Sequence, residues 1–61
     1  MDINEAERKA TEYVNNRGPA QVTGHTQDAY TITIHGVFAG TGGEWSVTYD
    51  KKTNKMISHT P

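Results

Sequence analysis

The chain has 61 residues, with six lysines and arginines, seven acidic residues, three histidines and no cysteine. A chain of this length forms one small domain, here residues 1–61, and buries only about 60% of the surface that its unfolded form exposes. The missing cysteines exclude disulfides and thiolate metal sites, and a net charge of −1 disfavours a dedicated nucleic-acid binder, which normally carries a basic stripe.

The first predicted element is a helix over residues 3–16. Asp2 is suited to accept a free backbone amide at its N-terminus, and Glu5 follows three residues later, as in a capping box. The helix is expected to end in the segment NNRGP, where Gly18 suits a left-handed position and Pro19 stops continuation. Its apolar residues recur at helical spacing and form one stripe: Ile3, Ala6, Ala10, Tyr13 and Val14.

After Pro19 the apolar residues alternate with polar ones, which predicts strands. We expect four strands, over residues 20–26, 30–38, 44–50 and 55–59. The glycine-rich segment between the second and third strands predicts a flexible hairpin loop. Alternation assigns one set of side chains to an inner face that packs on the helix: Val22, Tyr30, Ile32, Ile34, Trp45, Val47, Tyr49 and Met56.

These elements predict an α+β fold, with one N-terminal helix packed on one face of a three- to four-stranded antiparallel sheet. One helix covers only one face of such a sheet, so the other face stays open to water or to a partner. The residues expected on this outer face are rich in hydroxyl groups and form the predicted contact surface for a partner: Thr31, Thr33, His35, Ser46 and Thr48.

The last hairpin, WSVTYDKKTNKM, carries the most specific motif. The order of helix and strands, closed by this hairpin, resembles the PepSY domain family, whose final strands follow the pattern V-x-V-D-x-x-T-G-x-V. Asn54 replaces the glycine of that pattern, and asparagine tolerates the left-handed backbone that such turns need. The resemblance implies an extracytoplasmic regulatory or peptidase-inhibitory role and brings no catalytic residues. The matching positions are Val47, Tyr49, Asp50, Thr53 and Met56.

Two interpretations of the final turn stay open. In the structural one, the Asp50 carboxylate accepts hydrogen bonds from turn amides while Thr53 and Asn54 close the loop. In the functional one, the turn presents its positive charges to an acidic partner. The residues of this second hypothesis are Lys51, Lys52 and Lys55.

The histidines suggest a metal site as a second hypothesis. Strict alternation places His25, His35 and His59 on the outer face, where three imidazoles would hold zinc and leave one position open. No two of them have a spacing typical of metal ligands, so exposed strand histidines are the simpler interpretation. We therefore expect no cofactor.

Catalysis by this chain is not expected. Ser46, His35 and Asp50 lie near one another in the predicted sheet, but an open flat face supplies neither an oxyanion hole nor water exclusion. The sequence favours a non-catalytic binding or regulatory module, which acts as a PepSY-like inhibitor by contact with another protein. The alternatives are a metal- or small-ligand-binding protein and a small cytoplasmic phage- or plasmid-type inhibitor of a host protein.

The sequence also bears on location. No apolar run approaches the length of a membrane span, so no membrane insertion is expected. The N-terminus lacks the basic and apolar regions of a signal peptide. These features predict a cytoplasmic protein if Met1 is the native start, and an extracytoplasmic one if a signal peptide was removed.

Overall fold

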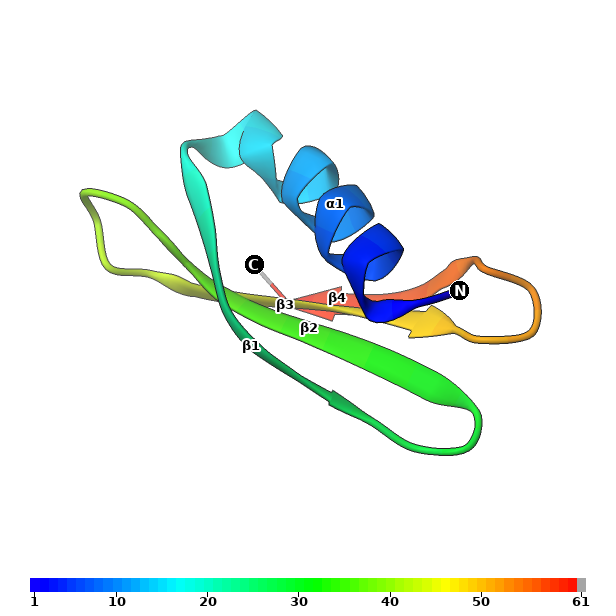
Figure 1. Ribbon diagram of the computed structural model, residues 1–61. Helices are drawn as coiled ribbons and strands as arrows, with labels where there is room; N and C mark the ends of the chain where they lie inside the picture. The colour runs from blue at the N-terminus through cyan, green and yellow to red at the C-terminus, as the bar shows by residue number, and fades with distance from the viewer. Residues whose placement is uncertain (61) are drawn as a thin grey trace.

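A computed structural model describes residues 1–60 of the chain. Its helix and four antiparallel strands confirm the predicted α+β fold (Figure 1). The strands pair in the order β1-β2-β3-β4, so each strand lies beside its neighbour in the sequence. In chain order the elements are α1 (Ile3–Val14), the 3-10 turn η1 (Asn15–Arg17), β1 (Ala20–Gln27), β2 (Thr31–Phe38), β3 (Glu44–Asp50) and β4 (Met56–Thr60).

The helix begins as predicted and ends slightly earlier. The backbone amide of Glu5 donates to Asp2 Oδ1 at 2.8 Å, which satisfies one of the free amides at the N-terminus. At the other end the helix tightens into η1, and Gly18 follows with a φ of 141°. A tightened last turn is common at helix ends, which is why α1 stops at Val14 rather than at residue 16.

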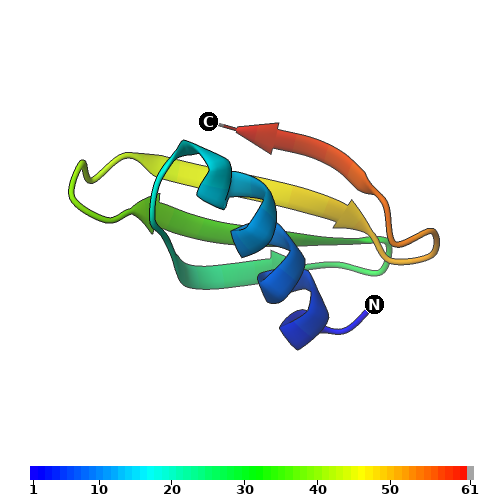
Figure 2. The same cartoon turned by 90° about the horizontal axis from the view of Figure 1, so that it is seen from above.

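The core lies between α1 and the sheet. Figure 2 shows the helix crossing over the strands, and its contacts are with β1, β2 and β3, whereas those with β4 are few. The helix contributes short side chains, which let its backbone approach the sheet closely, and the two central strands supply the large ones. The buried residues are Ala6, Ala10, Val14, Ile32, Ile34, Trp45, Val47 and Tyr49.

Two residues predicted for the inner face differ in the structure. Tyr30 lies in the turn before β2 rather than in the strand, and its side chain is 78% exposed, so its prediction as a core residue is wrong. Its backbone amide donates to Asp28 Oδ1 at 2.8 Å, and this turn takes the place of a first strand residue. Met56 does pair with Tyr49 on the inner side, yet it remains 38% exposed because α1 hardly reaches β4.

Both edge strands contain a β-bulge. The pairing of β1 with β2 shifts between Val22 and Gly24, and that of β4 with β3 shifts beside Met56. A bulge inserts one extra residue, so the side chains that follow change face relative to strict alternation.

At Gly36, neighbouring strands leave no room for a side chain. It pairs with Trp45 of β3, and a Cβ atom at this position would overlap the indole ring and the Gln21 carbonyl oxygen of β1. The indole Nε1 donates to the Val37 carbonyl at 3.0 Å, which fixes the ring in this place. The strand therefore needs glycine here for space, not for an unusual φ.

Candidate functional site

Figure 1 shows α1 covering one face of the sheet, and the five residues predicted to contact a partner alternate with the buried residues of β2 and β3, so they lie on the other, open face. Thr33 is directly opposite Thr48, and His35 is directly opposite Ser46. Thr31 precedes them on β2 and pairs with Asp50. Their side chains are half-buried, except for the exposed His35. The sheet thus brings together the residues that sequence alternation placed on one surface.

Hydrogen bonds link hydroxyl groups across this face. Thr33 Oγ1 and Thr48 Oγ1 lie 2.8 Å apart between the central strands. Towards the edges, Thr26 Oγ1 lies 3.3 Å from His35 Nε2, and Ser46 Oγ lies 2.8 Å from Thr60 Oγ1. These three pairs, called the hydroxyl network below, are separate hydrogen bonds that together involve all four strands.

The edge members of this network, Thr26 and Thr60, were missed by sequence reasoning. The β-bulges shift both residues onto the outer face, and a bulge has no signature in the apolar pattern of its own strand. Thr26 pairs with Thr33, and Thr60 pairs with Ser46.

Charge on this face is confined to its ends. Glu44 pairs with Val37 at one end, and Asp50 pairs with Thr31 at the other. The outward positions of the four strands within residues 1–60 carry no lysine or arginine. The outward strand positions are therefore hydroxyl-rich in the middle and carry one acidic side chain at each end, and at the Asp50 end Lys51 and Lys52 of the final turn lie beside that carboxylate.

Two aspartate turns lie at the Asp50 end of the sheet. Asp28 Oδ1 accepts the backbone amides of Tyr30 and Thr31, both at 2.8 Å. Those amide hydrogen bonds hold the pKa of the Asp28 carboxyl below its ordinary value, Tyr30 contributing most.

The turn of the final hairpin is held in the same way, by an aspartate carboxylate that accepts backbone amides. Asp50 Oδ1 accepts the amides of Thr53 at 2.9 Å and Lys52 at 2.8 Å, and these bonds lower the pKa of its carboxyl, Thr53 contributing most. Asn54 adopts a φ of 63°, as expected where the PepSY pattern has glycine. The structural interpretation of this turn is therefore confirmed in its hydrogen bonds.

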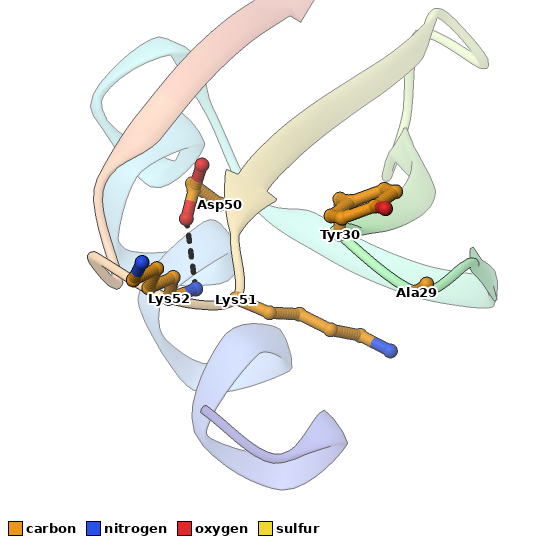
Figure 3. Close-up of a pocket in the computed structure, with 5 residues that line it drawn as sticks. All are labelled: Ala29, Tyr30, Asp50, Lys51 and Lys52. Carbon is orange, nitrogen blue, oxygen red and sulfur yellow. Dashed lines mark hydrogen bonds between the residues drawn. The ribbon is translucent and has the colours of Figure 1, made fainter.

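Lys51 joins the two turns. Its backbone amide donates to the Tyr30 carbonyl at 2.9 Å, and its ammonium donates to the Asp28 carbonyl. Of the three lysines predicted to face an acidic partner, Lys51 is thus engaged within the fold, whereas Lys52 and Lys55 are exposed. A pocket of about 320 Å³ lies between the turns. The residues that line it are drawn in Figure 3: Ala29, Tyr30, Asp50, Lys51 and Lys52.

The prediction that the three histidines share the outer face is wrong. His25 pairs with Ile34 and His59 pairs with Val47, so both lie on the helix side of the sheet, at opposite edges, while His35 lies on the outer face. The two β-bulges cause this change of side. The His59 ring instead packs edge-on against Tyr13, with ring centroids 5.3 Å apart. Across residues 1–60, no cluster of three or more potential metal ligands is present.

Comparisons with protein-family models, with curated proteins and with solved structures find no match for this chain. The PepSY resemblance therefore remains a prediction that depends on the hairpin motif. In the described part of the chain, residues 1–60, no helix is long and apolar enough to cross a membrane.

Because of the two aspartate turns, we expect the free energy of unfolding to decrease at acidic pH. Both carboxyl groups have a pKa below the ordinary 3.8 in the folded chain. The unfolded chain therefore binds more protons in this range, so stability falls as the pH falls. The stabilisation is fully present above pH 3.8 and is lost as the pH drops through the lower pKa values of the folded chain. Urea unfolding followed by Trp45 fluorescence, from pH 7 to strongly acidic pH, measures this loss.

A matched variant tests whether these two carboxyl groups cause the loss of stability at acidic pH. Asp28→Asn with Asp50→Asn keeps a side-chain oxygen at each turn but removes both ionisable groups. We expect this variant to be less stable at neutral pH and to lose less stability on acidification. Parallel losses in parent and variant would show that other groups cause the acid sensitivity.

Proposed function

We propose that this chain is a non-catalytic binding or regulatory module that contacts another protein through the open face of its sheet, as a PepSY-like inhibitor would. The observation that supports this proposal most strongly is the hydroxyl network of Thr33, Thr48, His35 and Ser46 on a face that α1 leaves uncovered.

The chemistry of the face indicates the kind of partner. Each hydroxyl group has one donor and two acceptor positions, so the Thr33–Thr48 pair keeps capacity to bond a partner after bonding itself. A neutral centre of this kind can be buried without the desolvation penalty of an ion. The exposed Glu44 at one end would pair with a basic side chain at the rim of the partner and orient it, whereas the Asp50 carboxylate is held by the amides of its own turn.

The same face is poorly suited to catalysis or to a metal. The polar groups lie on an open surface, which provides no preorganised oxyanion hole. The three histidines lie on two faces and three strands. Protein contact is therefore the function that these groups support best, and the mechanism is the same for an extracytoplasmic PepSY-like inhibitor and for a cytoplasmic inhibitor of a host protein.

The test adds bulk to the face without changing net charge. In Thr33→Arg with Thr48→Glu, the two new side chains lie directly opposite each other and can form a cross-strand ion pair that preserves the sheet. The control, Asn16→Arg with Asn4→Glu, introduces the same two residues at exposed positions of η1 and α1, away from the face. Immobilised parent, face variant and control are incubated with lysate, and the retained proteins are identified by mass spectrometry.

We expect a protein that the parent and the control retain and the face variant loses. For the purified partner we expect the face variant to weaken binding at least about tenfold, which corresponds to about 1.4 kcal/mol. Circular dichroism verifies that both variants are folded. Equal retention by parent and face variant would contradict the assignment of this face, and no specific retention by the parent would contradict protein binding itself.

A further inference from the structure

The edge strand β4 is unusually open. It pairs with β3 on one side, no strand among residues 1–60 pairs with its other side, and all five of its residues, Met56–Thr60, are exposed. None of these residues is charged. Natural sheets usually protect an edge with charged residues, proline, bulges or a covering element. Within Met56–Thr60 the one such feature is the bulge near the start of the strand.

Apolar side chains gather at this edge. Large hydrophobic residues that are exposed number four in the described residues, and three of them lie here: Tyr13 at 40%, Met56 at 38% and Ile57 at 55% exposure. Tyr13 extends from α1 and contacts the His59 ring of β4. Figure 2 shows β4 beside the helix rather than beneath it. Three of the exposed apolar side chains therefore lie on or next to the open backbone edge.

The opposite edge differs. The inner side of β1 is in contact with α1, and no large hydrophobic residue of β1 is exposed. Its exposed side chains are polar, among them Gln21, His25 and Thr26. An incoming strand would bury apolar surface at β4 but little at β1.

We propose that β4 pairs antiparallel with β4 of a second copy of this chain, which joins the two sheets into one of eight strands. Such a contact has two-fold symmetry, and each copy uses the same surface. The strand carries no charge that would repel its own copy.

Lys55, just before β4, indicates the orientation of the two strands. Antiparallel pairing puts the two lysines at opposite ends of the seam, about 15 Å or more apart. This separation exceeds the screening length of about 8 Å at physiological salt. Parallel pairing would place them side by side.

The arrangement has a geometric consequence. A two-fold axis perpendicular to the sheet keeps both helices on one face, so Tyr13 and Met56 of the two copies flank the seam. On the other face, Ser58 and Thr60 lie at the seam, and the hydroxyl network of one copy meets that of the other. This inference does not depend on the proposed function, because the variants that test it lie outside the hydroxyl network.

Sedimentation equilibrium from micromolar to millimolar concentration tests the proposal. We expect the mass of the parent to rise from 6.7 kDa towards twice that value. Ile57→Lys adds a charge to the exposed edge and should raise the dissociation constant at least tenfold. His25→Lys adds the same charge to the exposed β1 edge and should leave it unchanged. A monomeric parent over the whole range, or equal effects of both variants, would overturn the proposal.

Hydrogen exchange of the unmodified chain provides a second readout that does not depend on the folding of a variant. We expect the amides of residues 56–60 to become more protected as concentration rises, while those of residues 20–27 do not. Concentration-dependent protection in β1 instead would place the contact at the other edge. Protection of β4 that appears only when another protein is added would show that its occupant is not a second copy.

Discussion

The Gly36→Ala variant is expected to lose most of its stability, although the change adds a single methyl group. The new Cβ would overlap two indole carbons of Trp45 and the backbone carbonyl oxygen of Gln21. The indole is 2% exposed and hydrogen-bonded to Val37, and a backbone oxygen inside a paired strand has little freedom to move. Overpacking typically costs about 1–3 kcal/mol and occasionally more. A core of this size supplies only about 3–5 kcal/mol.

Gly24→Ala is the matched control. Gly24 lies in the adjacent strand, and its added Cβ would meet no atom within 4 Å. We expect stability to be unchanged or to rise by about 0.4–1 kcal/mol, because alanine restricts the unfolded chain. Urea unfolding, followed by circular dichroism, compares the two variants. Equal losses would show that the sheet disfavours any side chain at a glycine, and that crowding at Trp45 is not the cause.

The Ile34→Ala variant is expected to show the second large loss. Ile34 is fully buried in β2, pairs with Val47 of β3 and belongs to the hydrophobic core. Truncation of a buried isoleucine typically costs about 2–5 kcal/mol, which includes the cavity left behind. That loss is comparable with the whole stability expected for the domain. A substantial fraction of this variant should be unfolded at 25 °C without denaturant.

Ile57→Ala makes the same chemical change on the surface. Ile57 is 55% exposed at the β4 bulge, so at micromolar concentration its truncation should change stability by no more than about 0.5 kcal/mol. Thermal unfolding of both variants, measured at the same concentration, gives the difference. Similar losses from the two truncations would show that β4 contributes more to the core than its exposure indicates.

The sequence predicted the features that local chemistry decides. The cap at Asp2, the alternation in β2 and β3 and the turn at Asp50 are each determined by residues within one short segment. Residues 44–50 were predicted as a strand and form β3 with the same limits. Most of the candidate face follows from these two central strands, which explains why its five predicted residues do lie together.

Most of the missed features depend on contacts between distant segments, whereas the one at Tyr30 comes from a local turn. A bulge is a property of two paired strands, so neither β1 nor β4 reveals by its own pattern that His25 and His59 lie on the helix side. Tyr30 fits a strand by composition, but the turn at Asp28 takes its backbone amide. How far α1 reaches across the sheet depends on tertiary packing, and it decides how exposed Met56 remains.

The order β1-β2-β3-β4 also affects how the chain folds. Every strand pairs with its immediate neighbour in sequence, so each step closes a short loop, and folds dominated by such local pairings form faster than sheets with distant ones. A ribosome releases the strands in the same order in which they join the sheet. Each new strand can therefore add to an edge that already exists, and β4 completes the sheet last.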